Sequence, residues 1–321
     1  MKRADVEMRS VAERTHHLAD DQPHAFWDNT LPPRLLIEPG DTVVFETLEG
    51  TGQVTPETTS KKLAELDPSL IHALSGPVLI NGARPGDTLE VEVLALEHHG
   101  WGWNGVIPGF GLLGWEFTAP YIHHYVIEED LCMFRDDIRI PFEPFCGVMG
   151  VAPAERGRFD TAPPRVNGGN VDIRHLTPGA RVCLPVLSDG ALFSCGDCHA
   201  AQGDGEICGT GIETPMTVTL RFHLDRGKSI PELQFLTAPG RQLTQADSNG
   251  YFATTAHGPD LFANSQTAVR YMLEHLMDEY ALTREEAYCL CGAAVDLRIS
   301  EIVDEPNWIV SAYLPSSIFR L

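Results

Sequence analysis

Short alternating apolar segments, separated by turns that contain Pro and Gly, recur along the 321-residue chain. After the turn Pro85-Gly86-Asp87, the segment LEVEV at residues 89–93 alternates apolar and acidic side chains. Similar turns begin at Pro39 and, more loosely, at Pro178. Pro followed by Gly favours a type II turn, because Gly tolerates a positive φ. Alternation with a period of two indicates half-buried strands, so the pattern predicts stacked β-hairpins in a sandwich or barrel.

Helical periodicity occurs only near the end of the chain. Residues 264–280 carry an apolar stripe with the spacing of a helix face. Thr283 precedes Glu286 by three residues, which is the spacing of a capping box and predicts a second, short helix over residues 284–291. Residues 294–303 and 308–313 return to strand composition. The predicted fold is therefore mainly β with a small C-terminal α+β part.

Two further segments define the expected organisation. The polar, Pro-rich stretch at residues 154–166 predicts a surface connection. It divides an N-terminal β-rich portion, residues 1–153, from a C-terminal β-rich portion, residues 154–321, with helices around 264–291. The segment 100–118 is rich in Gly and Trp, lacks a helical period and predicts an ordered loop with aromatic anchors.

Charge and termini limit the classes of partner. The chain carries 45 Asp and Glu against 23 Lys and Arg, a formal net charge of −22. Such a surface repels nucleic acid and anionic membranes. Residues 1–12 lack the apolar stretch of a signal peptide, and no apolar run is long enough to span a bilayer. We therefore expect a cytoplasmic protein whose eight cysteines are thiols.

The densest group of polar residues lies between Ser194 and Glu213, in the stretch 167–213 that we interpret as a candidate active site. Asp197 and His199 are one residue apart, so in a strand they would share a face and could bind one cation. A Gly-bearing turn then leads to Glu206, which could fold back over the pair. Hard ligands and a nearby base are what metal-assisted hydrolysis requires. The alternative is a polar hairpin in solvent.

A second candidate segment, NGGNVD, covers residues 167–172. Consecutive glycines allow close approach of the backbone, so the amides of Gly168 and Gly169 are candidates for an oxyanion hole beside Asn170. Asp172 is a candidate ligand or base. A plain turn is the alternative interpretation.

The sequence disfavours several other kinds of hydrolase active site, because the residues or motifs that they need are missing. Its four lysines lie outside any Gly-rich context, which disfavours sites that use a Lys to activate Ser or Cys. No G-x-S-x-G elbow is present. A Cys nucleophile, Cys146 or Cys198, stays open as an alternative.

The run GD-x-HA-x-QGDGE at residues 196–206 resembles the signature stretch of the acetamidase/formamidase family. Residues 168–172, 147–153 and 72–77 are similar to the family in the same order. The resemblance spans roughly residues 14 to 310. The cysteines at 195 and 198 depart from it and, as ligands, would favour softer ions.

The resemblance implies hydrolysis of short linear amides, such as formamide or acetamide, to a carboxylate and ammonia. It also implies a β-rich fold, a homodimer or larger assembly, and a divalent metal, with zinc as the expected ion. Related members act on small cyclic amides, so hydrolysis of a lactam is an alternative.

From these residues we expect Asp197 and His199 to bind the metal, with His72 or Asp172 completing the site. Glu206 is the expected general base. Two other classes stay open: a module that binds or senses small amides without turnover, and an assembly protein that has lost its catalysis.

Overall fold

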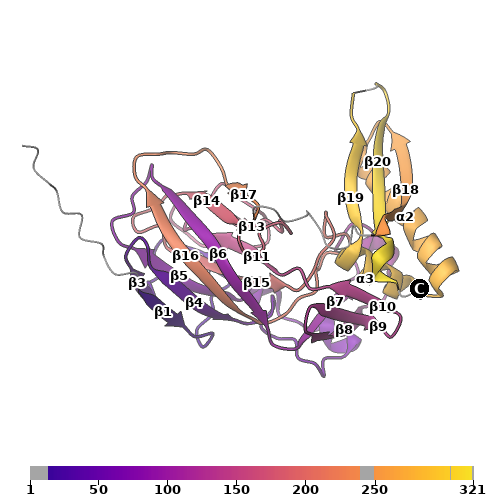
Figure 1. The fold of residues 1–321 in the computed structure, drawn as a ribbon, viewed down its shortest axis with the longest axis horizontal. Coiled ribbons are helices and arrows are strands. Elements are labelled where there is room, and N and C mark those ends of the chain that lie inside the picture. The colour runs from indigo at the N-terminus through magenta and orange to yellow at the C-terminus, as the bar shows by residue number, and fades with distance from the viewer. Residues whose placement is uncertain (1–13, 239–248, 304, 320–321) are drawn as a thin grey trace, which may run out of the picture.

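The computed structural model describes residues 14–238, 249–303 and 305–319 (Figure 1). Residues 1–12, on which the expectation about a signal peptide rests, lie outside the described part. The structure is mainly β, with its two long helices near the C-terminus. The predicted fold class is therefore confirmed.

Two sheets form a sandwich on the left of Figure 1. The six-stranded sheet has the order β1-β4-β16-β6-β14-β17, formed by Thr15–Leu18, Thr42–Thr47, Met216–Asp225, Thr88–His98, Arg181–Pro185 and Gln234–Leu236. The five-stranded sheet has the order β13-β11-β15-β5-β3, formed by Gly168–Asn170, Phe145–Gly150, Phe193–His199, Leu74–Ile80 and Leu35–Ile37.

Three aromatic rings join the two sheets of the sandwich. Phe45 of β4 and Phe222 of β16 belong to one sheet, and Phe193 of β15 belongs to the other. The centroid of the Phe193 ring lies 5.1 Å from that of Phe222 and 6.2 Å from that of Phe45. All three side chains are fully buried. Inward-facing residues on alternate strand positions thus build the core that the sequence pattern predicts.

A four-stranded antiparallel sheet adjoins the sandwich. Its order is β10-β9-β8-β7, formed by Ile138–Pro141, Leu131–Arg135, Tyr121–Glu128 and Trp101–Val106. The prediction of a loop over residues 100–118 is wrong for its first part, which is strand β7. This strand is buried on both faces, so it shows no alternation in the sequence. Smaller elements are β2 (Phe26–Trp27), β12 (Phe159–Asp160), α1 (Ser60–Leu63) and the 3₁₀ turns η1 (Pro68–Leu70) and η2 (Gly114–Glu116).

The three Pro-Gly turns named in the sequence have the expected backbone. Gly40, Gly86 and Gly179 adopt φ values of 102°, 97° and 92°. These values lie in the region that the third position of a type II turn requires. Gly is needed at these positions for its backbone freedom, since a side chain at Gly40 or Gly86 would meet nothing within 4 Å.

The C-terminal α+β unit stands beside the sandwich, coloured orange to yellow in Figure 1. Its sheet has the order β18-β20-β19, formed by Tyr251–Gly258, Trp308–Pro315 and Asp296–Glu301, and η4 (Ser316–Ile318) follows. Helix α2 (Leu261–Tyr280) begins slightly before the predicted segment, because Asp260 caps it. Helix α3 (Arg284–Ala294) begins at the predicted capping box of Thr283 and Glu286, which is confirmed.

Buried ion pairs and main-chain hydrogen bonds join this unit to the sandwich. Arg174 pairs with Asp296 at the start of β19 and, at 3.1 Å, with Glu143. Asp296 Oδ1 accepts a hydrogen bond from the Asp204 amide at 3.0 Å, and the Leu297 amide donates to the Asp204 carbonyl. The loop that follows β15 is therefore held by the C-terminal unit.

Among the described residues, no helix is long and apolar enough to cross a membrane. The division of the chain at residue 153 stays a prediction.

We expect Asp296→Ala to lower the free energy of unfolding by about 3 kcal/mol, because it removes one partner of a buried charge pair. The matched control is Asp137→Ala, which removes an exposed partner of Arg135 and should cost less than about 1 kcal/mol. Urea unfolding of both variants measures the difference. Equal losses for the two variants would contradict the anchoring role of Asp296.

Candidate active site

A cavity of about 340 Å³ opens where the sandwich meets the four-stranded sheet. The main chain of Glu213 forms this junction, pairing with Trp103 of β7 on one side and with His199 of β15 on the other. Glu213 donates to and accepts from Trp103 at 2.7 and 2.9 Å. The polar side chains at the cavity wall are His72, Asn170, Asp197, Glu206, Thr210 and Glu213, together with Thr51 and Asp160 at its edge.

His199 ends strand β15 and is fully buried at the centre of the site. Its Nδ1 lies 2.7 Å from Gln202 Oε1, and Gln202 Nε2 donates to the Asp172 carbonyl at 3.0 Å. The Gln202 amide is thereby oriented so that its oxygen accepts the hydrogen of Nδ1. Nε2 of His199 consequently faces the carboxylates, 3.2 Å from Glu213 Oε1 and 3.6 Å from Asp197 Oδ2. It nevertheless makes no hydrogen bond to any residue that the structure describes.

Four carboxylates converge on this imidazole. The ligand atoms of Asp172, Asp197 and His199 all lie within 4.8 Å of one another, and so do those of His199, Glu206 and Glu213. His72 approaches from the segment before β5, with Nε2 3.7 Å from Asp197 Oδ2. The structure thus brings together His72, Asp172, Asp197, His199 and Glu206, five of the residues that the sequence singles out.

The three acidic residues named by the sequence have a left-handed backbone. The φ values are 47° at Asp172, 52° at Asp197 and 44° at Glu206. Few residues other than glycine adopt this region, and it carries strain. At Asp197 it interrupts the regular strand, so this carboxylate reaches His199 through a local change of backbone direction and not through simple alternation. Glu206 follows a tight turn in which its amide donates to the Gly203 carbonyl at 3.1 Å.

Glycines make room for the charged side chains on three sides. A Cβ at Gly50 would collide with Asp197 Oδ1 and lie 2.9 Å from Glu213 Oε2. At Gly147 it would lie 2.6 Å from Asp172 Oδ1, and at Gly211 2.5 Å from His199 Nδ1. These are approaches that real Cβ atoms do not make. The site therefore depends on backbone packed directly against carboxylate and imidazole.

Burial raises the pKa of three of the acids. The pKa of Asp172 rises to about 7, through burial and the Asp197 charge, with His199 opposing. The pKa of Glu213 rises to about 8 for the same reasons. Burial and the charge of Asp172 raise the pKa of Glu206 well above its usual range. Crowded acids without enough positive charge shift in this direction.

Asp197 and His199 shift in the directions of an ion pair. Burial alone would raise the pKa of Asp197, but the charges of His72 and His199 outweigh it and hold the pKa well below its usual range. Burial alone would lower the pKa of His199, but Glu213 and Asp197 raise it well above its usual range. These directions are those of a positively charged imidazole held beside a negatively charged carboxylate.

The structure does not place Gly168 and Gly169 at the cavity wall. The Gly168 amide donates to the Arg165 carbonyl at 3.0 Å, so its hydrogen is used within the turn. Gly169 packs against the ring of Trp27. The structure therefore gives no support to the expectation that these two amides hold an oxyanion, and of this segment Asn170 alone lines the cavity.

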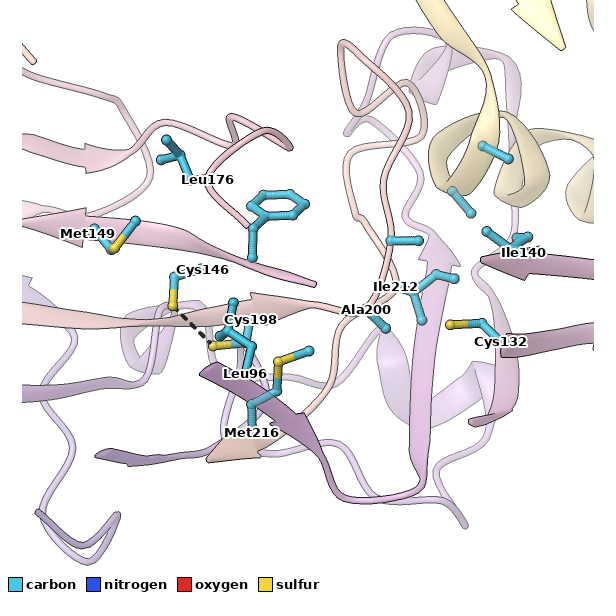
Figure 2. Close-up of a cluster of buried hydrophobic side chains, with 14 of the residues drawn as sticks. Leu96, Cys132, Ile140, Cys146, Met149, Leu176, Cys198, Ala200, Ile212 and Met216 are labelled. Carbon is cyan, nitrogen blue, oxygen red and sulfur yellow. Dashed lines mark hydrogen bonds between the residues drawn. The ribbon is translucent and has the colours of Figure 1, made fainter. Parts of the chain in front are cut away.

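The candidate nucleophiles Cys146 and Cys198 are buried in the core and do not line the cavity. Figure 2 shows Cys146 of β11 and Cys198 of β15 within a cluster of buried apolar side chains, with the two Sγ atoms 3.6 Å apart. The hydrogen bond to Cys146, together with burial, raises the pKa of Cys198 well above its usual range. A nucleophilic thiol needs a low pKa and access. The structure therefore gives the alternative of a Cys nucleophile no support.

Two residues of the site escape the sequence interpretation. Glu213 lies fourteen positions after His199 and reaches it only because the chain returns as an isolated bridge between two sheets. Gln202 belongs to the quoted QGDGE run, but its contact with Nδ1 depends on the tight turn after the strand. A polar residue within three positions of a candidate metal-binding His was the available signal for Gln202.

Comparison with known proteins decides the family. A family model described as the Acetamidase/Formamidase family matches residues 11–158 and 155–321. The chain belongs to the acetamidase/formamidase family. Formamidase from Methylophilus methylotrophus is 29% identical, with 94% of this chain and 90% of that protein covered. Membership of the family confirms the predicted enzyme class, an amidohydrolase that acts on linear amide bonds.

Two solved structures of similar proteins share the fold of this chain. A gamma lactamase from Delftia acidovorans has a TM-score of 0.87 and 26% identity, with 95% of this chain and 94% of that chain covered. Acetamidase from Bacillus halodurans has a TM-score of 0.65 and 33% identity, with 93% and 96% covered.

We expect Gly50→Ala to lower the amidase kcat/KM by about a hundredfold, because its Cβ displaces the carboxylates of Asp197 and Glu213. The control is Gly227→Ala, which lies outside the cavity lining and whose Cβ would meet nothing within 4 Å among the described residues. Its φ of 68° costs the Ala variant some stability, but kcat/KM of the folded protein should stay unchanged. Ammonia release measures both. Near-normal turnover of a folded Gly50→Ala protein would contradict the packing argument.

Proposed function

We propose that this chain hydrolyses small amides of the formamide and acetamide type to a carboxylate and ammonia, with water activated by a divalent metal. The expected ion is zinc, held by Asp197 and His199 and completed by His72 or Asp172. The observation that carries the proposal is the buried Nε2 of His199, which has no hydrogen bond within the described part of the chain although carboxylates surround it.

The residues fit a bound cation. Glu213 Oε2 and Asp172 Oδ1 are, like His199 Nε2, buried without a hydrogen-bond partner among the described residues. Buried polar atoms without partners are costly, and four neighbouring carboxylates repel one another unless a cation lies between them. Imidazole nitrogen and carboxylate oxygen are ligands that zinc accepts. A bound divalent ion polarises the amide carbonyl and lowers the pKa of water.

Each side chain then has a defined task. Gln202 fixes the tautomer of His199, so that Nε2 is free to act as a ligand. Glu206 lines the cavity and takes the proton from the attacking water at a carboxylate oxygen, then passes it to the departing amine. Asn170 lines the same wall and orients the amide. Trp103 is buried, and its Nε1 donates a hydrogen bond to Glu49 Oε2 at 2.9 Å. It lines the cavity and excludes bulk water from it.

A second candidate is hydrolysis of a small cyclic amide. The observation that favours it is the TM-score of 0.87 with the gamma lactamase, against 0.65 with the acetamidase from Bacillus halodurans. The same atoms serve both reactions, because a lactam presents the same carbonyl and the same C–N bond.

We further propose that the enzyme acts in the cytoplasm as a homo-oligomer on a free small molecule, without nucleic acid or membrane. The net charge of −22 supports the last two points. A sensing module without turnover is disfavoured, because binding alone does not require a buried base beside a candidate metal site.

The test is ammonia release from formamide, acetamide and a small lactam before and after chelation. We expect activity to fall at least tenfold on removal of the metal and to return with added zinc, since the metal activates the water. Elemental analysis of the untreated protein accompanies the assay. Full activity in protein shown to be free of metal would overturn the metal mechanism.

The role of Glu206 is tested in the same assay. Glu206→Gln should lower kcat by about a hundredfold or more, because it removes the proton acceptor and leaves the side-chain shape. Glu128→Gln, on the exposed face of β8, is the matched control and should be unchanged. The assignment fails if the Glu206→Gln protein is folded, metal-loaded and active.

Gln202 is tested by metal affinity, a property independent of turnover. Gln202→Leu should weaken zinc binding by about 10- to 100-fold, because His199 loses the acceptor that orients it. Gln202→Glu keeps an acceptor for Nδ1 and should retain more affinity. Competition with a chromophoric chelator gives the zinc dissociation constants of both variants. An unchanged constant for Gln202→Leu would contradict the orienting role of Gln202.

A further inference from the structure

The cavity is larger than formamide or acetamide requires. A space of about 340 Å³ holds on the order of ten water molecules at about 30 Å³ each. A substrate with three or four non-hydrogen atoms would displace roughly two or three of them. The remaining volume is available to a larger substrate group whose chemistry matches the walls.

The walls differ sharply in polarity. The candidate ligands and Glu206 gather at one end. Apolar side chains from two segments form a second part of the lining, Leu66, Pro68 and Ile71 before β5, and Ile107 and Phe110 after β7. The polar residues Thr51, Asp160 and Thr210 also contribute. Leu66 and Ile107 pack against the small apolar cluster around Trp103, so this wall is a built surface with its own packing.

Phe110 extends this wall to the mouth of the cavity. Its ring is 53% exposed although it is a large apolar side chain. It lies against Gly209, where a Cβ would come within 2.6 Å of the ring. The Gly209 amide donates to the Glu206 carbonyl at 2.8 Å, and Phe110 and Glu206 line the same cavity. An exposed aromatic side chain at the rim of a cavity marks a binding surface for apolar groups.

We propose that the preferred substrate is a primary amide whose acyl group is apolar and larger than acetyl, a medium-chain aliphatic or aromatic acyl group. The amide lies at the polar end, and the acyl group covers Leu66, Ile107 and Phe110. This inference rests on the proposed amidase function and specifies its substrate class. The reaction is unchanged: water adds to the carbonyl, the C–N bond breaks, and ammonia leaves with the proton passed on by Glu206.

The test compares kcat/KM of the zinc-loaded full chain for formamide, acetamide, butyramide, hexanamide and benzamide. We expect kcat/KM to rise by about fourfold for each methylene group that the wall covers, and at least tenfold from acetamide to hexanamide. A kcat/KM that is flat or falls with acyl length overturns the inference and leaves the amidase function standing. Absence of ammonia from every amide overturns both.

Variants of one loop locate the effect. Phe110→Ala should lower the ratio of kcat/KM for hexanamide to that for acetamide at least threefold, and Phe110→Leu should restore most of it. Trp115→Ala is the matched control: this nearby aromatic is 87% exposed, lies outside the cavity lining and should leave the ratio unchanged. An unchanged ratio in Phe110→Ala overturns the proposed placement of the acyl group.

Discussion

The structure around the site depends on one electrostatic constraint, the burial of an imidazole among four carboxylates. His199 is fully buried, and the acids around it lie in two sets that share it. Charges of this density are stable only with precise partners, because little water reaches them. The junction of two sheets supplies this arrangement: Glu213 enters from the bridge to Trp103, and Asp197 and His199 enter from the end of β15.

Local sequence determines a good part of this arrangement. The alternation of residues 89–93, the glycines of the Pro-Gly turns and the capping box at Thr283 each depend on neighbours in the chain, and the structure has all of them. Asp197, His199 and Glu206 are similar in this respect, since the first two lie at the end of one strand and a tight turn after it leads to Glu206. Strand β7 could not be predicted, because burial on both faces and two glycines remove its alternation.

The remaining site residues depend on distant segments. Glu213 is placed by the pairing of sheets, and His72 and Asp172 arrive from segments more than twenty residues away. The glycine pair at 168 and 169 shows the opposite case. Its sequence fits an anion-binding loop. In the structure, however, the Gly168 amide donates a hydrogen bond to the Arg165 carbonyl and Gly169 packs on Trp27, so the fold gives that function no support.

The left-handed backbone at Asp172, Asp197 and Glu206 lowers the stability of the fold at the positions of the candidate site residues. Each such residue costs on the order of 1 kcal/mol or more relative to a relaxed backbone, and glycine would adopt the same φ at no steric cost. Glycine carries no carboxylate, however. A chain selected only for stability would therefore favour glycine at all three positions. The acids found there cost stability, as expected for residues with the binding and catalytic roles proposed above.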